Sequence, residues 1–213
     1  KSVEKADKVY IENYTVEFPY RFNVLEKELG NIIPVDRNFV ESFKVLNEAK
    51  NKNIVLLVYG SPLTATTHIS LIQEAKKQGI KVKVVHGASI FDAVAETGLQ
   101  LYKFGKTTSL PNFKANSYLD VVKENLGIKA HTLILVDIGM SFKDAIDKLG
   151  KDCKVKGIKL NKIVICEHLG LKNSKICYNT LDKLKTKKVK APFCIVIPSE
   201  LHFMEEEFLE DFK

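Results

Sequence analysis

The stretch IVLLVYGSPLTATTHISLIQEAKKQGIKVKVV, residues 54–85, has the pattern expected of a strand, a turn, a helix and a second strand in succession. The continuous apolar run 54–59 predicts a central parallel strand that is covered on both faces. Residues 69–79 then predict a helix that is closed by Gly79, and residues 81–85 predict the next strand. This order is typical of an α/β fold with a parallel sheet.

The turn between them, GSPLTATTH (60–68), offers few side chains for packing, because its residues are mostly small or hydroxylated. In parallel α/β folds, ligands bind at the loops that follow the carboxyl ends of strands, where helix N-termini and free backbone amides converge. HGASI (86–90) and DIGMS (137–141) follow predicted strands in the same way. These three loops predict a site for a nucleoside-like ligand, and the spacings of a phosphate-binding loop, a serine nucleophile elbow and a zinc-binding His-Glu-x-x-His helix are absent.

The alternation of strands and helices continues on both sides of this stretch. A polar segment, GKTTSLPNFKANS (105–117), interrupts it, so we predict two tandem α/β domains, 1–112 and 113–213. Ser89 is a plausible N-cap for a helix over 87–98, and Ser141 with Asp144 approximates a capping box. The other predicted strands are 9–14, 31–36, 132–138, 162–167 and 193–198, and the other predicted helices are 39–50, 141–150, a short one near 180 and 203–212.

Composition is that of an ordinary folded protein. The chain has 213 residues, of which 45% are hydrophobic, enough for one large or two small cores. No apolar run reaches the length of about 18 residues that a membrane span needs, and the first residues lack the apolar segment of a signal peptide. We therefore expect a cytoplasmic protein without a membrane partner.

The four cysteines lie in the second half of the chain without a Cys-x-x-Cys pair. This spacing favours buried free thiols over a zinc ribbon or a disulfide framework, and we expect no metal. The net charge of +7 is concentrated in the lysines of LDKLKTKKVKAP (181–192). Such a cluster can attract nucleic acid or an acidic partner, or it can be a solvated surface. It has no interleaved aromatic residues for stacking on single-stranded bases.

Six segments resemble the diphthine synthase family, which belongs to the tetrapyrrole methylase superfamily. Of these segments, TGLQLYKFGKTTSLP (97–111) resembles diphthine synthases more closely than the wider superfamily, and the short chain resembles archaeal members. The other five, in order, are VYIENYT (9–15), GSPLTATTH (60–68), VVHGASI (84–90), HTLILVDI (131–138) and ELHFMEEE (200–207).

The resemblance implies an S-adenosylmethionine-dependent methyltransferase that works as a homodimer, with the cofactor in the cleft between its two domains. It implies transfer of three methyl groups to the amino group of the 3-amino-3-carboxypropyl side chain on a histidine of elongation factor 2, giving diphthine, with no nucleic acid required. Two alternatives remain open: another methylase of the superfamily, acting on a corrin precursor or ribosomal RNA, or a basic binding subunit without catalytic activity.

Carried over by position, the resemblance implies seven cofactor contacts, of which Ser89, Val136 and His202 also have ordinary structural explanations as a helix cap, a core residue and a structural histidine. It implies no single catalytic residue. His68 and His86 are candidates for accepting a proton, and Tyr102, Phe104 and Tyr118 are candidates for holding the cationic product through their ring faces. The seven expected contacts are Ser61, Thr64, Ser89, Ile90, Val136, Leu169 and His202.

The chain departs from the family pattern in three places. Ser61 stands where the family usually has an aspartate beside the cofactor. EHLGLKNS (167–174) replaces the usual Arg-Ala-Gly-Ser, which affects the register of Leu169. The family usually has a strand and a glycine-rich turn before ADKVYIENY, and the numbered sequence begins at Lys1, within the expected first helix; we expect the first strand to be missing from this sequence.

Overall fold

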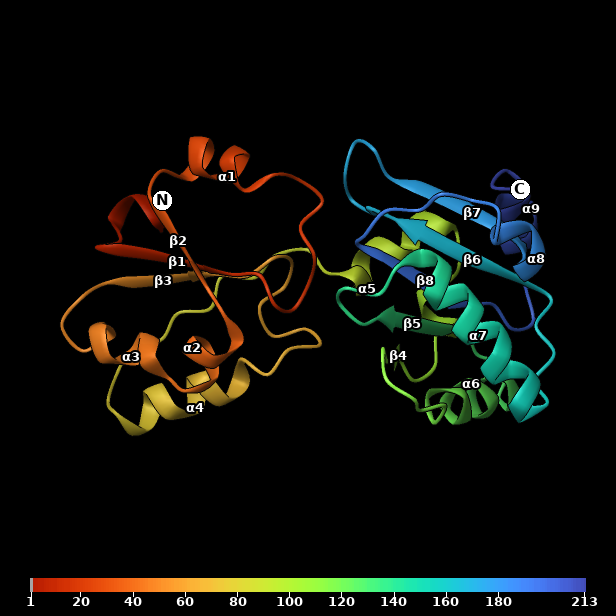
Figure 1. Cartoon of the computed structure of the whole chain (residues 1–213), viewed down its shortest axis with the longest axis horizontal. Helices are drawn as coiled ribbons and strands as arrows, with labels where there is room; N and C mark the ends of the chain where they lie inside the picture. Colours follow the sequence, from red (N-terminus) through yellow and green to blue (C-terminus); the bar gives the residue numbers. More distant parts are fainter. Residues whose placement is uncertain (1) are drawn as a thin grey trace. The chain divides into compact units, whose positions relative to one another are not determined.

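The computed structural model describes residues 2–213, and the chain divides into two compact units, Lys1–Ser89 (unit 1) and Ile90–Lys213 (unit 2) (Figure 1). Both units combine a β-sheet with packed helices, as the predicted α/β class requires. The division after Ser89 differs from the boundary that we predicted after residue 112. Val94 and Leu99 explain the difference, because both are buried in the same apolar cluster as Leu133 of unit 2.

Unit 1 is built on a three-stranded parallel sheet in the order β2-β1-β3. Side chains of β1 alternate between the two faces, so that Val9 and Ile11 contact one apolar cluster and Tyr10 contacts another. Helix α1 covers the first face, and helices α2, α3 and α4 cover the second (Figure 1). The elements are η1 (Val3–Lys5), β1 (Lys8–Glu12), α1 (Phe22–Leu29), β2 (Ile32–Val35), α2 (Arg37–Glu41), α3 (Lys44–Ala49), β3 (Ile54–Leu57) and α4 (Ile69–Lys77).

Three local predictions for unit 1 are wrong. The helix predicted over 39–50 is broken into α2 and α3, because Phe43 adopts a left-handed conformation with φ of 61°. Within residues 2–213, β3 pairs with β1 alone and is therefore an edge strand, not the predicted central one. The predicted strand 81–85 is not formed among these residues; Val82 and Val85 there are 46% and 60% exposed.

Unit 2 is built on a five-stranded mixed sheet in the order β4-β5-β8-β6-β7, in which β4 and β5 are parallel and the remaining pairs are antiparallel. Helices α6, α7 and α8 pack on one face of this sheet, and η2 and α9 pack on the other (Figure 1). The elements are α5 (Ile90–Ala93), η2 (Val94–Thr97), η3 (Leu101–Lys103), β4 (Thr108–Leu110), α6 (Tyr118–Gly127), β5 (Thr132–Val136), α7 (Phe142–Lys156), β6 (Lys162–Glu167), β7 (Lys175–Thr180), α8 (Leu181–Leu184), β8 (Phe193–Ile197) and α9 (Phe203–Glu210).

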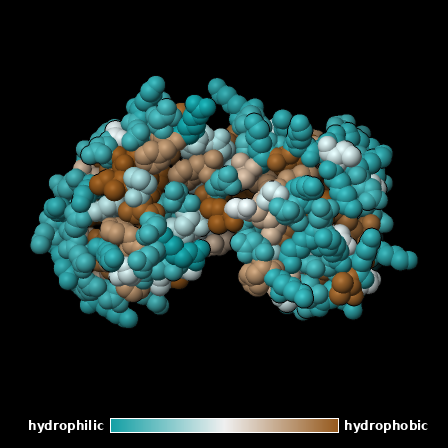
Figure 2. Space-filling view, viewed as in Figure 1, coloured by the Kyte–Doolittle hydropathy of each residue, from teal (hydrophilic) through white to brown (hydrophobic). Residues whose placement is uncertain are grey.

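The face that Figure 2 shows is polar over much of its area, with apolar patches between the polar residues. Hydrophilic side chains cover much of the visible face of each unit in Figure 2, and lysines of the 181–192 cluster are exposed around the buried Leu184. Three of the four cysteines are buried and Cys177 is half-buried, and all four are free thiols. No helix within residues 2–213 combines the length and the apolarity that crossing a bilayer would require.

Candidate functional site

The loop 60–68, which follows β3, approaches residues 86–90 at Gly60 and Gly87, which both lie in unit 1. A Cβ atom on Gly87 would come within 2.8 Å of the carbonyl oxygen of Gly60, so this approach requires glycine at position 87. Gly60 itself has φ of 84°, and the turn continues with a hydrogen bond of 3.2 Å from the Thr64 N–H to the Ser61 carbonyl. The structure therefore brings loops 60–68 and 86–90 together and leaves the side chains of Ser61 and Thr64 half-buried.

His68 anchors the first loop from inside. Its Nδ1 lies 3.0 Å from the carbonyl oxygen of Pro62, its Nε2 lies 3.3 Å from the hydroxyl of Tyr14, and the residue is 5% exposed. A carbonyl can only accept, so Nδ1 carries the proton and Nε2 accepts from the Tyr14 hydroxyl. Burial, followed by the nearby charge of Glu12, raises the pKa of Tyr14 to about 12, which keeps the hydroxyl protonated as a donor. His68 is thus fully engaged, whereas His86 is exposed on the second loop.

Glu12, which the sequence analysis did not single out, fixes the loop that follows β1. Its carboxylate is completely buried and accepts hydrogen bonds from the backbone N–H groups of Tyr14 and Thr15, at 3.0 and 3.1 Å, and from the Thr15 hydroxyl. Glu12 is the last residue of β1, so it lies at the carboxyl edge of the sheet. The sequence signal that could have identified Glu12 is its position as a charged residue directly after the apolar run VYI.

Two expected contacts in unit 2 share one apolar cluster. Ile90, the first residue of α5, and Leu169 both pack against the cluster that contains Val94 and Val164. Leu201, the neighbour of His202, packs against the same cluster. Val136 instead ends β5 and packs against the cluster on the other face, and Ser89 precedes α5 at the end of unit 1. The structure thus brings Ile90 and Leu169 together on one side of unit 2, on the side where His202 also begins α9.

His202 is the N-cap residue of α9. Its Nδ1 accepts a hydrogen bond of 3.3 Å from the Met204 N–H, so in the neutral ring the proton is on Nε2. The ring is exposed and lies beside Phe203, with 4.2 Å between ring centroids. Capping therefore leaves His202 with an exposed Nε2–H that can donate a hydrogen bond to a ligand.

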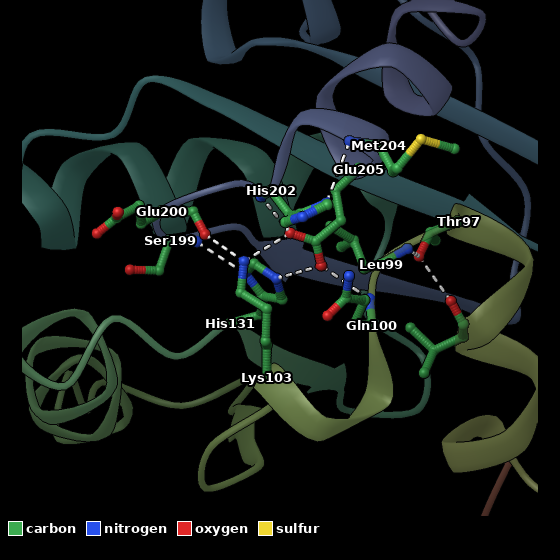
Figure 3. Close-up of polar contacts among 11 residues, drawn as sticks. Thr97, Leu99, Gln100, Lys103, His131, Ser199, Glu200, His202, Met204 and Glu205 are labelled. Carbon is green, nitrogen blue, oxygen red and sulfur yellow. Dashed lines mark hydrogen bonds and ion pairs between the residues drawn. The ribbon is translucent and has the colours of Figure 1, made fainter.

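Behind His202, a buried polar network centres on Glu205 (Figure 3). Glu205 and His131 are both 0% exposed, and Glu205 Oε1 lies 3.2 Å from His131 Nε2. Ser199 N–H donates to His131 Nδ1 at 2.9 Å, so His131 carries its proton on Nε2 and donates it to Glu205. Burial lowers the pKa of His131 against the opposing effect of Glu205, which keeps the ring neutral.

Three further donors complete the coordination of the Glu205 carboxylate. Lys103 Nζ lies 2.6 Å from Oε2, and the Gln100 and His202 N–H groups lie 2.8 Å from Oε1 and 2.7 Å from Oε2. Burial alone would raise the pKa of Glu205, but these hydrogen bonds together lower it to about 2. Glu205 lies in the predicted helix 203–212, but its burial was not predicted from the sequence.

The three aromatic candidates differ in accessibility. Tyr102 is 100% exposed, in η3. Phe104 packs its ring edge-on against His131, with 5.5 Å between centroids, and Tyr118 is 4% exposed and donates its hydroxyl to Asp152 at 3.0 Å. Tyr102 alone of the three presents an open ring face. Within residues 2–213, no group of three or more His, Cys, Asp or Glu side chains could hold a metal ion.

Comparison with known proteins gives consistent matches along nearly the whole chain. The family model of the Tetrapyrrole (Corrin/Porphyrin) Methylases matches residues 4–185. Diphthine synthase of Methanocaldococcus jannaschii is 39% identical, with 99% of this chain and 90% of that protein covered. Diphthine synthase of Archaeoglobus fulgidus is 33% identical, with 100% and 87% covered. A crystal structure of a diphthine synthase, 33% identical, superimposes with a TM-score of 0.91 over 99% of this chain and 87% of that one.

Proposed function

Because the chain belongs to the diphthine synthases of the tetrapyrrole methylase family, and is therefore an S-adenosylmethionine-dependent methyltransferase of diphthamide biosynthesis, we propose that its substrate is elongation factor 2. The acceptor would be the amino group of the 3-amino-3-carboxypropyl side chain on a histidine of that factor, and three methyl groups would be added to give diphthine. The observation that supports this proposal within the fold is the close approach of the loop that follows β3, 60–68, to residues 86–90.

The residues of the chain suit the cofactor that this proposal requires. Hydroxyl groups of Ser61 and Thr64 can exchange hydrogen bonds with a ribose or a carboxylate, and Ile90 and Leu169 offer apolar contact for a base. His202 offers a donor at Nε2. We propose that these residues, together with Ser89 and Val136, contact the same cofactor molecule.

When bound, S-adenosylmethionine supplies a methyl group that is already activated on a sulfonium. The protein then needs to hold the acceptor amine in line with that group and to keep water away, and it needs no covalent intermediate. The amine attacks with its lone pair, so it must be unprotonated, and the first two transfers each leave a proton that must depart. Exposed His86 is a better candidate to accept that proton than His68, whose two ring nitrogens are occupied.

The product of the third transfer is a permanent cation with no proton to lose. The open ring of Tyr102 can stabilise such a group through a cation–π contact. We further propose that the protein works as a homodimer in the cytoplasm and that its macromolecular partner is elongation factor 2. The exposed lysines near residues 181–192 then need no nucleic acid partner.

The proposal is tested by incubating the protein with radiolabelled S-adenosylmethionine and elongation factor 2 that bears the unmethylated side chain. We expect label in the protein substrate and a mass increase that corresponds to three methyl groups. A Ser61→Trp variant with an unchanged melting temperature serves as the binding-deficient control. Label in ribosomal RNA or in a corrin precursor, and none in elongation factor 2, would overturn the proposal.

A further inference from the structure

We propose that Glu205 is a positioning residue for cofactor binding, which fixes the segment Ser199–His202 so that the Nε2–H of His202 faces the ligand. The inference rests on the proposed function in one respect, the expected contact between His202 and S-adenosylmethionine. Its remaining support comes from the buried network of unit 2, which holds this segment to two others distant in sequence (Figure 3).

Three backbone groups of the segment Ser199–His202 form hydrogen bonds with side chains of the network. Ser199 N–H donates to His131 at 2.9 Å, the Glu200 carbonyl accepts from Lys103 Nζ at 2.5 Å, and His202 N–H donates to Glu205 at 2.7 Å. His131 and Lys103 are in turn both bound to Glu205. The Glu205 carboxylate therefore takes part in all three hydrogen bonds, either directly or through the side chain of His131 or Lys103.

The chemistry of position 205 is restrictive because all four of its partners are donors. Oε1 accepts from Gln100 N–H and from His131 Nε2–H, and Oε2 accepts from Lys103 and from His202 N–H. A carboxylate has only acceptor sites and can accept at both oxygens, whereas an amide has one acceptor oxygen and one donor nitrogen. Glu205→Gln keeps the shape of the side chain but places N–H groups against two donors, whichever way the amide is turned.

The same network holds the neighbouring segment that carries the open ring of Tyr102. Gln100 and Lys103 lie on either side of Leu101 and Tyr102, and both bind Glu205. The fully exposed Tyr102 therefore lies between two residues that are both hydrogen-bonded to Glu205. We therefore expect loss of the Glu205 carboxylate to displace both the segment Ser199–His202 and the segment 100–103.

The test is a double-mutant cycle on S-adenosylhomocysteine binding, measured by calorimetry well below the melting temperature of each variant. The variants are Glu205→Gln, His202→Ala and the combination, with Glu207→Gln as the matched control, because Glu207 is an exposed glutamate on the same helix. We expect Glu205→Gln and His202→Ala each to weaken binding about tenfold, and the combination to weaken it no further than His202→Ala alone. The control should bind as the parent does.

The outcomes separate the positioning role from the proposed function. Additive effects of the two substitutions, or a folded Glu205→Gln variant with parental affinity, would overturn the positioning role. Absence of binding in the parent would instead refute the proposed function, and parental affinity of His202→Ala would remove the His202 contact and the inference with it.

If Glu205→Gln does not fold, Lys103→Met takes its place in the cycle, with Lys106→Met as its control. Lys103 ties the Glu200 carbonyl to Glu205, whereas Lys106 forms an exposed ion pair with Glu124. We expect Lys103→Met to weaken binding in the parent and not in the His202→Ala background. An equal effect in both backgrounds would overturn the proposal.

Discussion

The Glu205 carboxylate should make unit 2 sensitive to acid, and substitution by glutamine should remove much of that sensitivity. The pKa of Glu205 is lowered from 4.5 to about 2 by its four hydrogen-bond donors. A folded pKa below the unfolded one means that the carboxylate contributes stability above about pH 4.5, and that this contribution is lost as the pH falls towards 2. The gap between the two pKa values, at about 1.4 kcal/mol per pKa unit, corresponds to about 3 kcal/mol of unfolding free energy at neutral pH.

The assay is denaturant unfolding of the parent and of Glu205→Gln at several pH values between 7 and 2.5, followed by circular dichroism. Comparison of the two proteins cancels the titration of other carboxylates that they share. We expect the difference in unfolding free energy to be largest near pH 7 and to shrink by about 3 kcal/mol at most as the pH approaches 2. Parallel pH profiles for the two proteins would refute the assignment of Glu205 as an ionised, buried hydrogen-bond acceptor.

Three other predictions concern the loops of unit 1. Ser61→Asp should leave S-adenosylmethionine binding unchanged or tighten it up to about tenfold, since a partly solvated carboxylate contributes on the order of 1 kcal/mol beside a cation, whereas Ser61→Trp should abolish binding; calorimetry measures both. Gly87→Ala should destabilise the protein by about 1–3 kcal/mol in thermal melts, because its Cβ would lie 2.8 Å from a backbone oxygen, whereas Gly127→Ala, with open space around it, should not. Tyr14→Phe should remove the hydrogen bond to His68, cost about 1 kcal/mol and increase hydrogen exchange in residues 62–68; unchanged exchange would argue against that tie.

Where local sequence determines local structure, the elements were predictable. Ser141 with Asp144 predicts the start of α7, and in the structure the Ser141 hydroxyl accepts the Asp144 N–H at 3.1 Å. Gly79 likewise follows α4 with φ of 71°. The periodicity of residues 39–50 was right for packing, since Phe39 and Leu46 contact one cluster, but it could not reveal the left-handed turn at Phe43. Helical spacing reports which face is buried and does not report whether the helix is continuous.

Whether a segment forms a strand, and where that strand lies in the sheet, depends on the strands it pairs with, and sequence patterns do not identify those strands. The run 54–59 was read as central because it is apolar throughout, and its side chains do face helices on both sides of the sheet. Its position in the sheet, however, is decided by backbone pairing, and among residues 2–213 β3 pairs with β1 alone. The segment 81–85 has the composition of a strand and no strand partner among the same residues. Apolarity thus predicted that apolar clusters lie on both faces of the strand and left the order of the strands undetermined.

Glu205 shows most clearly what a sequence conceals at a site. It stands first in a run of three glutamates, and composition gives no reason to separate it from Glu206 or Glu207, which are exposed. Its partners are contributed from positions 100, 103, 131 and 202, so no local pattern contains them. Two local signals were nevertheless present: Glu205 lies three residues after the N-cap His202, the spacing of a capping box, and four residues before the buried Leu209, which places both on one face of α9. A glutamate that combines these two positions faces the core and needs hydrogen-bond donors there. In the structure, His131 and Lys103 are two of these donors.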